Sequence, residues 1–332
     1  MAAIGNTNLT LIDLAKRMDP TGRMASVAEL LSAKNEMLDD MTWSQGNLDT
    51  GDRFTIRTGI PSATWRRINQ GTAPTKSTTA QIDLACGALE ARAQIDTKLL
   101  AIAADEGSLL MSESKAFVEG MSQKAQTALI YESQATNSER ITGLAQYYST
   151  VSTATAASAA NVISAGGSGS DNTSIYLIVW DAETITGIVP KNSKAGLDMR
   201  DLGEQRVLDA SSNPFQAREL LFSWDLGLKV KDWRYGVRIC NIDISDLTYN
   251  AATGANLIDL MVQAVERIDN LGAGKAAIYC NRTIRSYLRR QLMNKSNVWL
   301  ARETVAGKPV LTFADIPVRR VDMLLNTEAT VS

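Results

Sequence analysis

Few side chains of this chain could do chemistry, because none of its 332 residues is histidine. The lack of histidine rules out Ser-His-Asp and Cys-His catalysis, histidine metal ligands and imidazole proton shuttles. Lysine, tyrosine, carboxylate or cofactor chemistry stays open. An enzyme of this length without histidine would be unusual, so we predict no catalytic or metal site and no bound cofactor.

One stretch has the superficial look of a phosphate-binding loop. It reads DNLGAGKAAIYC and brings Gly272, Gly274 and Lys275 together. A true P-loop carries an earlier glycine and a Ser or Thr after the Gly-Lys pair, and it follows a strand. Here Asn270 and Ala276 occupy or adjoin those places, and the segment precedes a strand-like run. We interpret it as a turn that ends a helix.

Basic residues gather in RTIRSYLRRQLMNK, a stretch that also has helical spacing. They are Arg282, Arg285, Arg289, Arg290 and Lys295. They could form an ordinary solvated helix face. They could also contact an acidic surface or a phosphate backbone, and the sequence leaves both interpretations open.

The strongest interaction signal is a tryptophan followed by two arginines in a polar stretch. RTGIPSATWRRINQGTAPTKSTTAQ, residues 57–81, contains Trp65, Arg66 and Arg67 among Thr, Ser, Gly, Pro and Gln. Tryptophan and arginine are enriched at interface hot spots. An exposed tryptophan on a monomer would be a liability, and the stretch offers few apolar neighbours to cover it. We therefore favour an intersubunit anchor over one that packs within the chain.

The elements that would position this tryptophan are two strands and a helix. Phe54 and Ile56 alternate with polar residues, and LEARAQID, residues 89–96, alternates in the same way, as half-buried strands do. We expect these strands to form a β-arm that reaches roughly 30 Å. Apolar residues recurring every four positions then predict one helix over about 108–132.

A Ser, Thr, Ala and Gly-rich stretch, residues 147–174, separates this part from a second domain. Strand-like runs follow at 174–181, 222–243 and 277–281. One helix is predicted on the apolar repeat that starts at Leu257, and a second after Asn281, whose side chain should cap it. Strands alternating with two helices indicate an α+β or α/β domain.

Composition narrows the class of protein. The hydrophobic fraction of 45% and the charged fraction of 21% are ordinary for a folded soluble chain, and the net charge of −2 provides no global basic field for nucleic acid or membrane. No apolar run approaches the ~20 residues that span a bilayer, and no signal peptide is evident. The three cysteines are few, odd in number and far apart, which indicates a reducing cytoplasm.

Several segments in order resemble the major capsid proteins of tailed bacteriophages with the Hong Kong 97 fold, especially those of short-tailed phages of the epsilon-fifteen type. The resemblance runs over most of the chain, and none of its pieces is a catalytic signature. It is carried by GIPSATWRRINQGTAPTKSTTAQ, LIYESQATNSERITGLAQYY, SIYLIVWDAETITGIVPKNSKAGLDMRDLGEQ, DWRYGVRICNID and FADIPVRRVDMLLNTEATV.

The resemblance implies an α+β capsid fold with four parts. They are an N-terminal arm (1–50), an E-loop β-hairpin (51–96), a peripheral domain with a long spine helix (97–148) and an axial domain (149–332). Strands at about 222–243 are expected to return to the peripheral domain. The E-loop, which lies over the adjacent subunit in this family, would carry the intersubunit contact residues Trp65, Arg66, Arg67 and Lys76. Some relatives cross-link through a loop lysine, but the partners that Lys76 would need cannot be matched here.

The function implied is a coat protein that self-assembles into hexamers and pentamers of an icosahedral head around double-stranded DNA. The expected partners are further copies, a separate scaffolding protein, a portal, a possible decoration protein and non-specific contact with the DNA. The virion shell would be its location and the host bacterial cytoplasm its place of synthesis. An encapsulin-like compartment shell and, less favoured, a histidine-free enzyme remain as alternatives.

Overall fold

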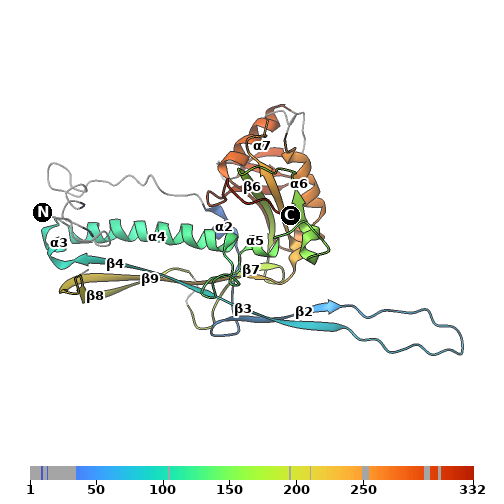
Figure 1. Cartoon of the computed structure of the whole chain (residues 1–332), viewed down its shortest axis with the longest axis horizontal. Coiled ribbons are helices and arrows are strands. Elements are labelled where there is room, and N and C mark those ends of the chain that lie inside the picture. The colour runs from blue at the N-terminus through green and yellow to red at the C-terminus, as the bar shows by residue number, and fades with distance from the viewer. Residues whose placement is uncertain are drawn as a thin grey trace.

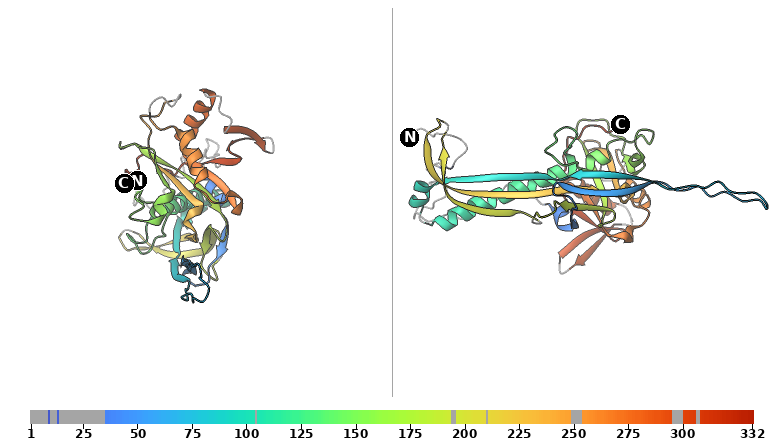
Figure 2. Two further views of the ribbon diagram at one scale, coloured as in Figure 1. Left: turned by 90° about the vertical axis from the view of Figure 1, so that its right-hand side faces the viewer. Right: turned by 90° about the horizontal axis from the view of Figure 1, so that it is seen from below.

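A computed structural model of the chain describes residues 9, 13, 35–103, 105–193, 196–209, 211–248, 254–294, 300–305 and 308–332. Most of the expected N-terminal arm (1–50) therefore lies outside the described residues. The chain has a narrow part built on helix α4, a compact part that carries α6 and α7, and a hairpin that projects beyond both (Figure 1). Figure 2 shows how thin the hairpin is when seen from below. No helix in the described ranges has the length and apolar character to cross a membrane.

The narrow part, which we call the peripheral unit, is a three-stranded antiparallel sheet beneath a long helix. Its elements are β4 (Gly87–Asp96), β8 (Asp198–Leu208), β9 (Pro214–Val230), α3 (Thr97–Ile102) and α4 (Glu106–Tyr131). The helix expected over about 108–132 is thus α4, capped by Asp105, whose Oδ1 accepts from the backbone N–H of Gly107 at 3.0 Å. Phe117 of α4 stacks on Phe222 of β9, with ring centroids 5.4 Å apart, and holds the helix on the sheet.

The compact part, which we call the axial unit, has a mixed sheet with helices on both faces. Its strands are β5 (Val162–Ser164), β6 (Asn172–Trp180), β7 (Ile185–Val189), β10 (Gly236–Asp243), β11 (Lys275–Cys280), β12 (Leu300–Val305), β13 (Lys308–Phe313) and β14 (Ile316–Arg320). Its helices are α5 (Leu144–Tyr147), α6 (Leu257–Glu266) and α7 (Arg282–Asn294), with 3₁₀ turns at Ala157–Asn161, Trp233–Tyr235 and Leu271–Ala273. Preceding all of these, α2 (Glu36–Asp40) packs on this unit and β1 (Trp43–Gln45) pairs with β7.

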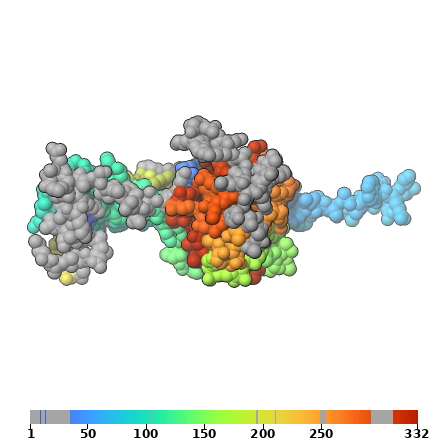
Figure 3. All heavy atoms as spheres, turned by 90° about the horizontal axis from the view of Figure 1, so that it is seen from above, coloured from blue at the N-terminus to red at the C-terminus, as the bar shows by residue number. Residues whose placement is uncertain are grey.

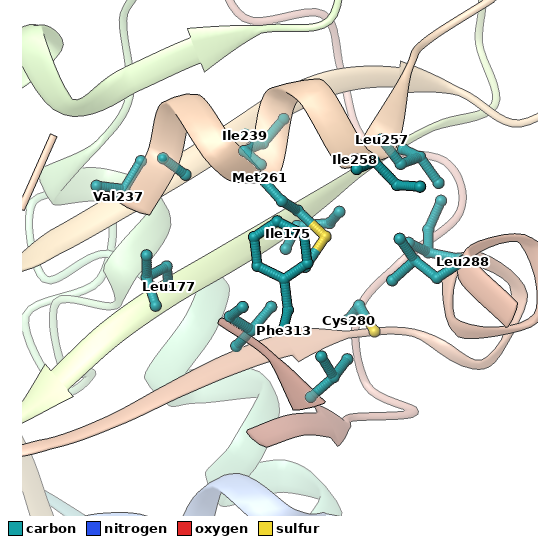
Figure 4. Close-up of a cluster of buried hydrophobic side chains, with 14 of the residues drawn as sticks. Ile175, Leu177, Val237, Ile239, Leu257, Ile258, Met261, Cys280, Leu288 and Phe313 are labelled. Carbon is teal, nitrogen blue, oxygen red and sulfur yellow. The ribbon is translucent and has the colours of Figure 1, made fainter. Parts of the chain in front are cut away.

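Strand β6 is buried along all nine residues because it faces two cores. Ile175 and Leu177 point to the core under α6 and α7, where Met261 and Phe313 meet them (Figure 4). The alternate residues, including Tyr176 and Trp180, face the core that α2, α5 and the end of α4 cover. A continuous apolar run, not an alternating one, is what a strand buried on both faces requires.

Strand β9 belongs to both units. Residues 217–226 pair with β4, and Gly227 to Val230 pair with β7 of the axial sheet. We expected the return to the peripheral part at about 222–243. Residues 222–226 of β9 pair with β4 within this range, whereas β10 pairs with β5 and β6 inside the axial sheet. The domain boundaries themselves stay a prediction.

A buried polar network joins α4 to the axial sheet and to the C-terminal segment. Arg238 of β10 places Nη2 2.9 Å from Oε2 of Glu328, and each side chain is only 5% exposed. Glu328 also accepts from the hydroxyls of Tyr131, the last residue of α4, and Ser174 of β6. Arg238 donates in addition to Oγ of Ser174 at 3.1 Å and to the carbonyl of Tyr148 at 2.9 Å. Burial raises the pKa of the Tyr131 phenol well above its ordinary value, and the charge of Glu328 adds to this, so the phenol stays a donor.

Asn281 begins α7 as predicted, with its Oδ1 accepting from the backbone N–H of Ile284 at 2.8 Å. Replacing Asn281 with alanine is expected to lower the free energy of unfolding by about 1–2 kcal/mol, because the first turn of α7 loses its cap. Urea unfolding followed by circular dichroism measures the change. A loss below a few tenths of a kcal/mol would show that this cap does not stabilise the axial unit.

Candidate intersubunit interface

The projecting hairpin, which we call the E-loop, consists of β2 (Gly51–Gly59) and β3 (Thr78–Ala85). They pair antiparallel from Gly51 opposite Ala85 to Gly59 opposite Thr78. Our prediction that residues 89–96 form the second limb is wrong, because they lie in β4 and pair with β9. The alternation of apolar and polar residues shows which face of a strand is buried, but it does not identify the strand with which it pairs.

A signal for β3 was present in the sequence. Ala80, Ile82 and Leu84 alternate with polar residues, and Ile82 lies opposite Phe54 across the hairpin. One pair nearer the base and on the exposed face, Arg53 and Asp83 form a cross-strand ion pair, with Nε 2.5 Å from Oδ1 and Nη2 2.7 Å from Oδ2. The hydrogen bonds from Arg53 lower the pKa of Asp83.

The base of the E-loop is fixed to β9 by a nearly buried ion pair. Lys229 places Nζ 2.6 Å from Oδ2 of Asp52, with side-chain exposures of 14% and 8%, and lies 5.0 Å from the ring centroid of Phe54. Asn47 adds two hydrogen bonds to the backbone of Arg53, at 2.7 and 2.8 Å. The hairpin therefore leaves the body in a defined direction although its outer half touches little.

Replacing Lys229 with methionine is expected to loosen this base, because the buried carboxylate of Asp52 would lose its charged donor. A loss of about 2 kcal/mol in local opening energy corresponds to roughly thirty-fold faster amide exchange in β2 and β3. Hydrogen–deuterium exchange of the unassembled protein, with β6 as the internal reference, measures this. Unchanged exchange in the hairpin would show that the pair does not hold it.

The tip of the E-loop is exposed along its whole length, from residue 60 to residue 79. Trp65 is 102% exposed, Ile68 93% and Ile60 88%, so within the described chain nothing covers these apolar side chains. Arg66 donates from Nε to the carbonyl of Gln70 at 2.9 Å, which folds the tip back on itself. Arg67 and Lys76 also lie on this exposed segment.

A second group of exposed apolar side chains lies at the far end of the peripheral unit. They belong to α3, α4 and β8, and α3 and the start of α4 lie at the end opposite the E-loop in Figure 1. They are Ile102, Met111, Met199, Leu202 and Leu208, between 38% and 63% exposed. Sequence reasoning did not single them out, because scattered apolar residues in a strand or helix are normally assigned to the core.

The lysine of the predicted turn and the three cysteines do not form a reactive site. Lys275 follows the 3₁₀ turn at Leu271–Ala273 and places Nζ 2.8 Å from Oδ1 of buried Asp40. Burial raises the pKa of the thiols of Cys86 and Cys280 to about 12 and of Cys240 to about 11, which leaves little thiolate at neutral pH. Among the described residues, no three His, Cys, Asp or Glu side chains are placed to hold a metal ion.

Two comparisons with known proteins show the family of this chain. A family model for the major capsid protein GP7 matches residues 19–332. The cryo-EM structure of bacteriophage Epsilon15 is 35% identical, with a TM-score of 0.79, over 100% of this chain and 99% of that chain. The bacteriophage JBD30 capsid is 9% identical, with a TM-score of 0.49, over 89% of this chain and 92% of that chain. The SrpI encapsulin of Synechococcus elongatus PCC 7942 is 11% identical, with a TM-score of 0.43, over 70% of this chain and 96% of that chain. No curated protein matches.

Proposed function

The chain belongs to the GP7 family of major capsid proteins, and on this premise we propose that the E-loop tip of each subunit binds the peripheral unit of a neighbouring copy. The protein is a phage capsid subunit with the Hong Kong 97 fold. Contact between the E-loop tip of one copy and the peripheral unit of the next would join the subunits of the shell. The intersubunit roles of Trp65, Arg66, Arg67 and Lys76 are part of this proposal.

The observation that carries the proposal is the exposure of Trp65 on a hairpin whose base is held rigid. Burying a tryptophan removes about 200 Å² from water, which corresponds to roughly 5 kcal/mol at 25 cal/mol per Å². In the isolated subunit Trp65 stays in contact with water, so this stabilisation can arise only when the tip binds another surface. The adjacent Arg66, Arg67 and Lys76 supply charged donors that can orient the contact.

The positions of the two exposed apolar groups support a head-to-tail contact. The E-loop tip lies at one end of the molecule, and α3 and the start of α4, which carry exposed Ile102 and Met111, lie at the other (Figure 1). A contact between two different surfaces of the same chain closes into a ring when the rotation permits. Rings of five and six such subunits are the pentamers and hexamers that we propose for the icosahedral shell.

The wider partners belong to the proposal as well. We propose that the shell encloses double-stranded DNA, that a separate scaffolding protein and a portal take part in assembly, and that a decoration protein can bind outside. Synthesis would take place in the cytoplasm of the host bacterium. A purely structural role, without catalysis, is supported by the absence of histidine from the sequence.

Electron microscopy of the purified full-length protein tests the proposal. Rings or closed particles are expected, and particles from infected cells should contain DNA. A stable monomer at every protein concentration and salt would contradict it. Particles that house an enzyme and no genome would favour the encapsulin-like alternative, which the family model and the 35% identity to a phage capsid do not favour.

A further inference from the structure

Helix α7 carries a basic pocket that the capsid contacts described above do not use. Its side chains surround a surface hollow of about 280 Å³. The lining residues are Arg282, Arg285, Ser286, Arg289 and Arg290 of α7 and Arg320 at the end of β14. Figure 3 looks down on the side of the axial unit that bears this helix. Lys295, the remaining basic residue of the predicted cluster, lies outside the described residues.

Carboxylates neutralise only part of this charge. Arg320 binds both oxygens of Asp322, at 2.7 and 2.6 Å, and Arg282 reaches the same carboxylate only at 3.8 Å. Nε of Arg285 is buried without a hydrogen-bond partner in the described chain. Arg290 stacks over the ring of Tyr287, 5.1 Å from its centroid. The pocket therefore has an excess of positive charge.

The helix bears this charge at an energetic cost. Arg282 and Arg285 lie in the first turn, where the helix dipole disfavours cations, and that turn contains no acidic residue. Arg285 and Arg289 are four residues apart, a spacing at which like charges repel. The opposite face of the helix, with Ile284 and Leu288, is fully buried in the core, so the arginines cannot turn away. A bound anion would relieve all of these repulsions.

We propose that the α7 pocket binds phosphate groups of a nucleic-acid backbone. Guanidinium groups pair with phosphate through two parallel hydrogen bonds, and contacts of this kind need no base sequence. Pairing of these arginines with carboxylates of a second copy is the alternative that the test below distinguishes from phosphate binding. This inference rests on the proposal that the shell encloses double-stranded DNA.

The test compares R289Q/R290Q with the wild type and with R140Q/R234Q, a pair of exposed arginines outside both the α7 pocket and the proposed intersubunit surfaces. Binding of the full-length protein to a short fluorescent DNA duplex is followed by anisotropy at a series of salt concentrations. The α7 variant should lose affinity on the order of tenfold at low salt, and the slope of log K against log salt should shrink by about 2, or about 0.9 per lost phosphate contact. The R140Q/R234Q control should match the wild type.

Particle formation, scored separately by electron microscopy, distinguishes this inference from the proposed function. Normal particles with unchanged DNA binding in R289Q/R290Q would overturn the pocket and leave the shell function standing. Loss of particles with unchanged DNA binding would overturn it too, since the arginines would then be a subunit contact. A wild type that binds DNA through α7 but never assembles would support the pocket and contradict the shell function.

Discussion

Trp65→Ala is expected to leave the subunit folded and to abolish particle formation. The ring is 102% exposed in the isolated chain, so its removal takes away no intrachain packing. In an assembled shell the same ring would contribute up to roughly 5 kcal/mol at each subunit contact, which is a factor of more than a thousand in the association constant. Because every subunit in a closed ring makes this contact, the loss is multiplied through the lattice.

Light scattering and thermal unfolding of the same samples measure both parts of this prediction. Thr72→Ala, at an exposed position of the same tip, is the matched control and should assemble normally. An unfolded W65A subunit would mean that the tryptophan stabilises its own chain. Normal particles from W65A would mean that the tip does not anchor the neighbouring subunit.

Glu328→Gln is expected to destabilise the subunit by about 3–5 kcal/mol, because it leaves Arg238 charged, buried and without its anionic partner. The same change weakens the hydrogen bonds from Tyr131 and Ser174, so α4 and the axial sheet should lose their shared attachment. The thermal midpoint of the unassembled protein, measured in the W65A background, reports this loss.

A double variant separates the ion pair from general damage to the core. R238M/E328Q removes both charges, so it should be more stable than the sum of the two single variants implies. Arg234→Met, which breaks exposed pairs with Asp232 and Asp269, is the control and should cost less than about 1 kcal/mol. If the losses of unfolding free energy in R238M and E328Q simply add up in the double variant, Arg238 and Glu328 are not a coupled pair.

Local features of the fold could be predicted from the sequence. The four-residue apolar repeat located α4 to within two residues at its start, and Asn281 was recognised as the cap of α7. The exposed tip was recognised from composition alone, because a polar segment without apolar neighbours cannot bury a tryptophan. These features depend on residues close together in the chain.

Features that join distant segments could not be predicted. Pairing of β4 with β9 brings together residues more than a hundred positions apart, and alternation does not encode that choice. The partnership of Arg238 with Glu328 was missed for the same reason. A signal existed, since one arginine in the otherwise apolar run GVRIC indicates a buried charge that needs a partner.

A high-resolution reconstruction of the assembled particle tests the central claim most directly. We predict that the Trp65 ring is buried against the peripheral unit of an adjacent copy, near the exposed apolar residues of α3, α4 and β8. A shell in which the hairpin tip remains in solvent, or folds onto its own subunit, would contradict the account.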